Sequence, residues 1–464
     1  MRRCLSAFLC ATLLVVALSS CAFSSFYKDP FAKFSENGEL QEAGVLLPEN
    51  DACQYVSDYL AYWGFPSFRL YKVKAIEDCY RAYYYRELPD VYRHAAMVYD
   101  AYREYVAGYV DKANADDVTG IVISLYQHAA GDKYAVYMDK EETASYKTQM
   151  QASLVGIGVS VQYHADKNQC IVVSTVPDSP AEKAGIKAGD RILSADGVSI
   201  ATDGYEAVVR AIGGKAGTRV SLVVGRDDKA IEYAIVREKI TLISVTHRII
   251  EQDVRVGYVK INEFNNKTAE QFRLAIDSVL AADVRGIVFD VRDNPGGDVT
   301  AVSDVLDYLI KDGGPLVHFL YREDSELADQ NTTLKADDGH EVSLPMTVLC
   351  NENTASAAEL FTSALRDYQM ALAVGETTYG KGTAQSVIEL ADDTMFTISV
   401  STYNPPFGDC YEGIGIVPDV EVPLPDHIES IPPTLRDDRD DAQLQAAIGL
   451  LKNGASPDGG KDLL

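Results

Sequence analysis

The sequence predicts a multidomain protein with a mainly helical N-terminal region, a small β-rich domain and an α/β core. Three observations predict this class. The chain has 464 residues, which is too long for one compact core. Strand-like segments separated by glycines follow one another from about residue 154, and strands alternate with helices from about residue 254. We therefore expect domains at residues 22–150, 152–240 and 243–425, and a C-terminal helix and tail at 426–464.

Composition and charge restrict the possible partners. Hydrophobic residues make up 47% of the chain and charged residues 24%, as in a globular protein. The formal net charge is −27, with 69 acidic and 42 basic side chains. Because nucleic-acid binding needs clustered Lys and Arg, this balance argues against a nucleic-acid partner.

The first 21 residues have the features of an export signal. Arg2 and Arg3 precede an apolar run of 14 residues at 5–18, which is short for a membrane span and suits a signal peptide. "LSSC" follows and ends at Cys21, which resembles the lipobox of bacterial lipoproteins. We expect a lipoprotein of the bacterial cell envelope, held to the membrane only by its lipid. The alternative is plain cleavage nearby, with Cys21 incidental.

The N-terminal region is the least informative part of the chain. Residues 22–90 match no pattern, whereas tyrosines recur at helical spacing from 91 to about 110 and predict a packed helix face. A second helix is expected at 115–128. Cys53 and Cys79 are either bridged or free. No CxxC and no HExxH occurs, so we expect no metal site and no cofactor.

The β-rich segment carries a specific motif. "VGIGVSVQY", "CIVVSTV", "RVSLVVGR" and "IEYAIVR" are strand candidates, with a short helix at 203–212. Between them lies "AGIKAGDRILSADG", and on this motif residues 152–240 resemble a PDZ domain. The resemblance implies a groove between "IGVSV" and the helix, where an extended peptide adds to the strand edge. A turn formed by Leu154, Val155, Gly156, Ile157 and Gly158 would hold the peptide's terminal carboxylate. The alternative is a small β-domain that binds nothing.

The C-terminal half predicts a sheet covered by helices. "VGYVKI", "GIVFDV", "TVLCN", "ALAVGE" and "FTISVSTY" are apolar strand candidates. Residues 268–281, 300–310 and 440–454 have apolar side chains at helical steps. This alternation is typical of an α/β core.

Within this core, "NTASAAELF" places Ser356 at the head of a helix. Ser356 and Glu359 fit a capping box, and one interpretation of Ser356 is therefore an ordinary helix cap. Thr354 is a second candidate for the cap, and Ser356 would then lie in the first helical turn. There the positive end of the helix favours an oxyanion, which suits a nucleophile.

A serine nucleophile needs a base, and none of the seven histidines lies in a motif typical of a triad. A lysine can serve if burial lowers its pKa by about three units. Lys381, between Gly380 and Gly382, and Gln385 four residues later form such a candidate pair. The alternatives are a solvated lysine in a glycine turn and an ordinary polar strand residue.

These segments together resemble the C-terminal processing peptidases, the tail-specific serine proteases. "NENTASAAELFTSALRDY" and "VGETTYGKGTAQ" match the family signature, with Ser356 and Lys381 at the family's spacing. The resemblance implies that Ser356 is the nucleophile, Lys381 the base and Gln385 the residue that orients it. It places the oxyanion hole at the N–H of Ala357 and of Gly296 or Gly297, in "FDVRDNPGG". Asp367 matches a recurrent family position and is interpreted as structural.

The resemblance also implies a core of crotonase-like or ClpP-like type. The predicted function is an exported serine endopeptidase that cleaves proteins near their C-terminal ends, with the PDZ domain selecting or gating unstructured tails. By analogy we expect helix-mediated homodimers. Two alternatives stay open: an inactive PDZ scaffold that binds protein C-termini, and a non-peptidase acyl-transfer enzyme on a crotonase-like core.

Overall fold

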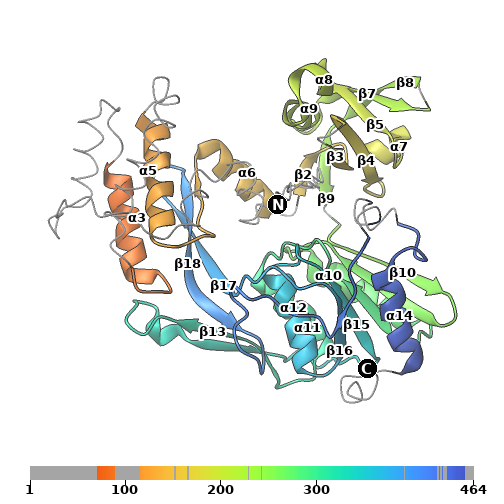
Figure 1. Cartoon of the computed structure of the whole chain (residues 1–464). Helices are drawn as coiled ribbons and strands as arrows, with labels where there is room; N and C mark the ends of the chain where they lie inside the picture. Colours follow the sequence, from red (N-terminus) through yellow and green to blue (C-terminus); the bar gives the residue numbers. More distant parts are fainter. Residues whose placement is uncertain are drawn as a thin grey trace, which may run out of the picture.

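The computed structural model describes residues 70–88, 115–150, 153–164, 167–227, 229–241, 243–390, 392–425, 428, 431 and 436–454. The predicted signal, Cys21, Cys53 and the tyrosine-rich helix from residue 91 therefore lie outside the described residues. Within the described ranges, no helix is long and apolar enough to cross a bilayer. Free thiols are found at Cys79, Cys170, Cys350 and Cys410. Figure 1 shows a helical region, a β-rich domain and an α/β core, which confirms the predicted multidomain fold.

The core is built on a six-stranded sheet in the order β10-β11-β12-β15-β16-β19. These strands are β10 (Val245–Glu251), β11 (Arg255–Ile261), β12 (Ile287–Asp290), β15 (Met346–Cys350), β16 (Ala371–Gly375) and β19 (Val420–Glu421). β10 is antiparallel to β11, and every other neighbouring pair is parallel. All residues of β12 and β15 are buried, which explains their continuous apolar sequences.

Helices cover both faces of this sheet. α10 (Thr268–Leu280), α11 (Val299–Leu309) and α12 (Ala357–Asp367) pack on one face, and α14 (Ala442–Asn453) packs on the other. The predicted helices at 268–281, 300–310 and 440–454 are thus confirmed to within about two residues. Because the strands are parallel, the loops after β12, β15 and β16 leave the same edge of the sheet. These three loops contain Gly296 and Gly297, Ser356, and Lys381 in turn, whereas the predicted Gln385 lies on β17 (Thr383–Glu389), the strand that follows the third loop.

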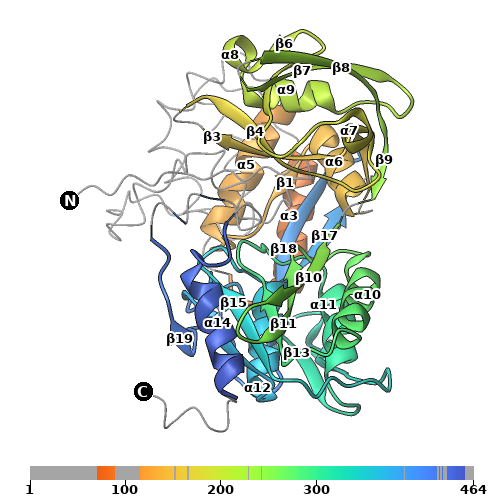
Figure 2. The ribbon, with the colours of Figure 1, turned by 90° about the vertical axis from the view of Figure 1, so that its right-hand side faces the viewer.

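A second sheet connects the core to the helical region. It consists of β1 (Tyr137–Met138), β13 (Pro315–Tyr321), β14 (Thr332–Lys335), β17 (Thr383–Glu389) and β18 (Met395–Asn404), with the 3-10 turn η1 (Ala328–Gln330) nearby. α3 (Leu70–Tyr83) and α5 (Ala115–Ala129) bury apolar side chains against Phe396, Ile398 and Val400 of β18. Figures 1 and 2 show both helices beside β18, so the helical region rests on the strand that pairs with β17, which follows the loop of Lys381.

The β-rich domain has its own sheet, in the order β3-β4-β5-β7-β8, with β6 beside β5. Its strands are β3 (Val159–His164), β4 (Gln169–Thr175), β5 (Arg191–Ala195), β6 (Val198–Ser199), β7 (Arg219–Arg226) and β8 (Lys229–Val236). Its helices are α7 (Pro180–Ala184), α8 (Ile200–Asp203) and α9 (Tyr205–Ile212). β3 is an edge strand, as a peptide-adding groove requires.

A short stalk joins this domain to the rest of the protein. β2 (Ser153–Gly156) follows α6 (Lys140–Met150) and pairs with β9 (Glu238–Thr241) in a separate two-stranded sheet. In both views the domain stands away from the core above this stalk (Figures 1 and 2). The chain thus enters and leaves the domain side by side.

Candidate active site

Ser356 lies between β15 and α12 in a strained backbone conformation. Its φ of 55° and ψ of −120° are rarely adopted by residues other than glycine, and such strain is concentrated at functional sites. Ser356 occupies the N-cap position, and Ala357 is the first residue of the helix. The prediction that Thr354 caps the helix and leaves Ser356 inside the first turn is therefore wrong. The Thr354 hydroxyl instead donates to Val291 O at 2.9 Å, which ties this loop to the one after β12.

Glu359 links the serine to the lysine segment. Its Oε2 accepts hydrogen bonds from the backbone N–H of Ser356 and of Lys381, both at 2.8 Å. Its Oε1 accepts from the Thr378 hydroxyl at 2.6 Å and from Gly380 N–H at 2.7 Å. Glu359 is fully buried, so each of these bonds is made away from water. One carboxylate therefore holds both loops in a fixed relation.

Lys381 is a buried lysine with a specific partner. It is only 8% exposed, and its Nζ donates to Gln385 Oε1 at 3.0 Å. Gly380 has a φ of 88°, which allows the tight turn that the sequence predicted. Gly382 serves close packing instead, because an added Cβ would lie 2.7 Å from Cys410 Sγ. The solvated-lysine alternative is therefore wrong.

Tyr403 is a site residue that the sequence did not reveal. Its hydroxyl lies 3.2 Å from Ser356 Oγ and donates to Lys381 O at 2.8 Å. Tyr403 is fully buried near the end of β18, and burial raises the pKa of its hydroxyl. A neutral hydroxyl is therefore in contact with the serine oxygen. No spacing pattern could have indicated it, because 47 residues separate the two side chains.

The predicted oxyanion-hole residues lie together. A Cβ added to Gly296 would be 2.7 Å from Ser356 Cβ and 2.9 Å from Ala357 N, so the glycine loop packs directly on the helix start. Gly296 N–H donates to Asn294 Oδ1 at 2.8 Å, whereas neither Ala357 N–H nor Gly297 N–H has an acceptor among the described residues. Of the two glycines left open by the sequence, Gly297 is the one with an available donor.

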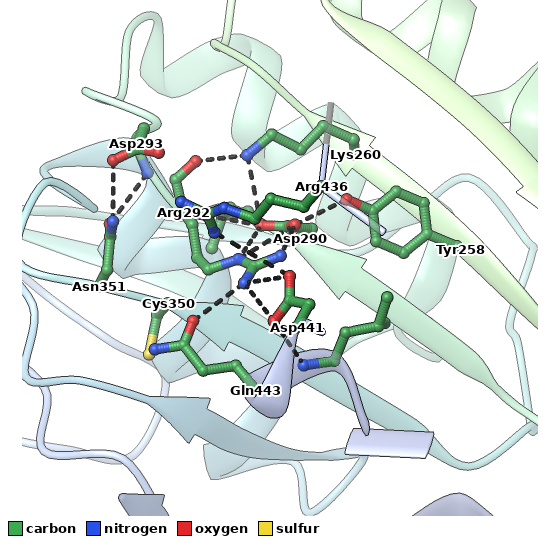
Figure 3. Close-up of polar contacts among 12 residues, drawn as sticks. Tyr258, Lys260, Asp290, Arg292, Asp293, Cys350, Asn351, Arg436, Asp441 and Gln443 are labelled. Carbon is green, nitrogen blue, oxygen red and sulfur yellow. Dashed lines mark hydrogen bonds and ion pairs between the residues drawn. The ribbon is translucent and has the colours of Figure 1, made fainter. Parts of the chain in front are cut away.

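A buried ionic cluster supports this glycine loop (Figure 3). The Asp290 carboxylate receives hydrogen bonds from Arg292, from the Tyr258 hydroxyl at 2.7 Å and from Lys260 at 3.3 Å. Arg292 also pairs with Asp441 at 2.8 Å, at the start of α14. Burial alone would raise the pKa of Asp290, but the charges of Arg292 and Lys260 hold it well below its usual range. The loop is thus anchored from the face of the sheet that α14 covers.

Comparisons with known proteins agree with this geometry. Peptidase family S41 matches residues 255–422, and the PDZ domain matches residues 171–226. The carboxy-terminal processing protease CtpA of Bacillus subtilis (strain 168) is 32% identical over 328 residues, which cover 70% of this chain and 68% of that protein. The chain belongs to this family of serine proteases.

Further relatives of this C-terminal processing protease agree. A CtpA-like serine protease of Staphylococcus aureus (strain MRSA252) is 32% identical over 327 residues, 70% of this chain and 64% of that protein. The solved structure of an S41 protease from Bacteroides fragilis NCTC 9343 shares the fold, with a TM-score of 0.52 at 18% identity. It covers 82% of this chain and 97% of that one. The chain therefore spans about two thirds of the length of these curated relatives.

The PDZ loop of this protease differs in part from the prediction. Leu154, Val155 and Gly156 form no turn, because they are strand residues of β2 paired with β9. Only Ile157 and Gly158 lie between strands, and among the described residues their N–H groups have no acceptor. Asp367 is structural, as expected, since its carboxylate accepts from Phe407 N–H at 2.8 Å.

Glu359 predicts how the activity of this protease depends on pH. Burial raises the pKa of its carboxyl above the usual value, against the effect of its hydrogen bonds. We expect activity to fall on acidification at a pH above the ordinary glutamate value of about 4.3, because a protonated carboxyl cannot hold both loops. Because the pKa of Glu359 is raised in the folded state, the folded protein binds this proton more tightly than the unfolded chain does. Protonation of Glu359 on acidification therefore does not lower the free energy of unfolding.

Pairing kcat/KM with thermal unfolding across that pH range tests this expectation. Glu359→Gln imitates the protonated form and should be poorly active even at neutral pH. If Glu359→Gln instead gave a pH–activity profile that overlaid the wild type, Glu359 would not be the group responsible.

Proposed function

We propose that this protease is an exported serine endopeptidase that cleaves proteins near their C-terminal ends with Ser356 and Lys381. One observation carries the proposal: the same Glu359 oxygen binds the N–H groups of Ser356 and Lys381, and the Lys381 amine is buried against Gln385. Lys381 in its neutral form takes the proton from Ser356 as Oγ attacks the peptide carbonyl. The N–H groups of Ala357 and Gly297 stabilise the oxyanion, each contributing about 3 kcal/mol to the transition state in comparable sites.

The later steps use the same groups. Lys381 gives its proton to the leaving amine, and an ester remains on Ser356. Lys381 then accepts a proton from the water that attacks the ester and returns it to Ser356 Oγ as the acid product leaves, which restores the neutral amine. Gln385 keeps the amine in place through its Oε1. We assign the protein to the bacterial cell envelope, with Cys21 lipidated after export, and we expect homodimers.

Substrates are expected to be unstructured C-terminal tails that bind to the PDZ domain. The available N–H groups of Ile157 and Gly158 support a carboxylate site at the start of the edge strand β3. The test is mass spectrometry of fragments from an unfolded protein, offered with a free or an amidated C-terminus. Cleavage that needs the free carboxylate supports tail recognition, and equal cleavage of both forms contradicts it.

A deletion tests the role of the PDZ domain directly. Gly156 and Glu238 are paired residues of the stalk, so an Asn-Gly turn can replace residues 157–237 and keep β2 paired with β9. We expect the preference for a free C-terminus to be lost, or the basal rate on a short internal peptide to change. If neither quantity differs from wild type, the PDZ domain does not select or gate substrates.

A further inference from the structure

The turn between α5 and β1 belongs to the helical region but lies at the catalytic lysine. α5 ends before Gly131, whose φ of 75° reverses the chain. Asp132 is buried, and its carboxylate accepts from Ser399 N–H at 3.0 Å, from the Ser399 hydroxyl at 2.7 Å and from the Tyr80 hydroxyl at 3.0 Å. The turn is therefore fastened to β18 and to α3 at once.

Tyr134 in this turn contacts the backbone before Lys381 directly and the backbone after it through Glu412. Its hydroxyl donates to Gly380 O at 3.2 Å and to Glu412 Oε1 at 3.0 Å. Glu412 Oε2 in turn accepts from Gly382 N–H at 2.8 Å. These contacts fix the chain before and after the lysine, although the two segments are 246 residues apart in sequence.

The same residue contacts the amine and its orienting amide. Lys381 Nζ lies 4.8 Å from the centre of the Tyr134 ring. Gln385 Nε2 donates to Tyr134 O, and its Oε1 accepts from Lys381 Nζ at 3.0 Å. Because an amide has one acceptor end and one donor end, the carbonyl of Tyr134 decides which end of Gln385 faces the lysine.

We propose that Tyr134 is a positioning residue of the active site, by which the helical region covers Lys381 and orients Gln385. This inference rests on the assignment of Lys381 as the base. It gives the N-terminal region a catalytic purpose that domain order alone does not suggest. The ring face attracts an ammonium ion, but the larger effect of a buried wall is to exclude the water that would keep the amine charged.

Trace acetylation of all lysines in the full-length protein, measured by mass spectrometry, tests without any substrate whether Tyr134 shields the Lys381 amine. We expect Lys381 to be protected in the wild type and in Tyr134→Phe, which keeps the ring. With the reaction run above about pH 10.4, where exposed lysines are also largely neutral, the labelling reports access to the amine alone. In Tyr134→Ala we then expect the acetylation of Lys381, relative to the exposed Lys147, to rise at least about fivefold as the amine becomes accessible. Tyr137→Ala is the matched control. Tyr137 lies on β1, directly after the turn that holds Tyr134, but its ring covers a different amine, with Lys72 Nζ of α3 5.7 Å from the ring centre.

Peptidase kinetics complete the test. Tyr134→Ala should lower kcat about 10- to 100-fold with KM nearly unchanged, because positioning of a base is lost and substrate binding is not. Unchanged acetylation of Lys381 in a folded Tyr134→Ala protein would overturn the inference. If the wild type cleaves nothing while the acetylation pattern responds as expected, the proposed function is wrong, but the inference that Tyr134 shields the Lys381 amine is still supported.

Discussion

Ser356→Ala and Lys381→Met should each abolish cleavage of an unfolded protein, with losses of at least about 10³-fold, because the proposed nucleophile and base act as one unit. Methionine suits the lysine site, since it fills the buried space without a charge that lacks a partner. Lys381→Arg should be equally inactive, because a guanidinium stays protonated and cannot accept a proton. Fragment mass spectrometry and the rate of peptide hydrolysis measure these losses.

Matched controls separate chemistry from folding. Ser363 is buried on the same helix, and its hydroxyl donates to Leu360 O at 3.1 Å, so Ser363→Ala should keep near wild-type activity. Lys147 pairs with Glu389 at the far end of β17, and Lys147→Met should also keep near wild-type activity. Cleavage retained by either purified site variant would reject the Ser-Lys mechanism and would favour an inactive scaffold or a different nucleophile.

Arg292→Met should be the most destabilising single substitution considered, costing about 3–5 kcal/mol of unfolding free energy. It leaves the fully buried Asp290 carboxylate without its main counter-charge and releases Asp441 at the start of α14 (Figure 3). Lys260 and Tyr258 still bind Asp290, so we expect the protein to fold at low temperature with a displaced glycine loop. Denaturant unfolding measures the loss.

Arg248→Met is the appropriate control. Arg248 also pairs with an aspartate near α14, Asp438, but both side chains are partly exposed, so about 0–1 kcal/mol is expected. Acidification gives a second measurement. The pKa of Asp290 is lowered in the folded state, so its contribution to stability is present above about pH 4 and is lost as pH falls further. Arg292→Met should lose this acid dependence, and a cost no larger than that of Arg248→Met would contradict the role of the cluster.

The sequence by itself determined the elements and the catalytic candidates. Apolar runs predicted the strands of the core and helical spacing predicted α10, α11 and α14, because these patterns reflect which face of each element is buried. Local motifs made Ser356, Lys381 and Gln385 candidates, since a helix start and a glycine turn are local backbone properties. Their predicted roles came from the resemblance to the C-terminal processing peptidases. The PDZ turn was only partly right, because pairing of β2 with β9 depends on a strand more than 80 residues away.

Only the tertiary structure decided how these residues are held together. The sequence places Glu359 where a capping box has its glutamate, but the structure shows that its carboxylate also binds Lys381 N–H, 22 residues further along the chain. No motif or spacing in the sequence indicates the roles of Tyr403 and Tyr134 or the pairing of Arg292 with Asp441. Periodicity records the burial of one element, whereas a hydrogen bond between distant segments depends on how sheets and helices pack, and packing sets which polar groups meet when water is excluded.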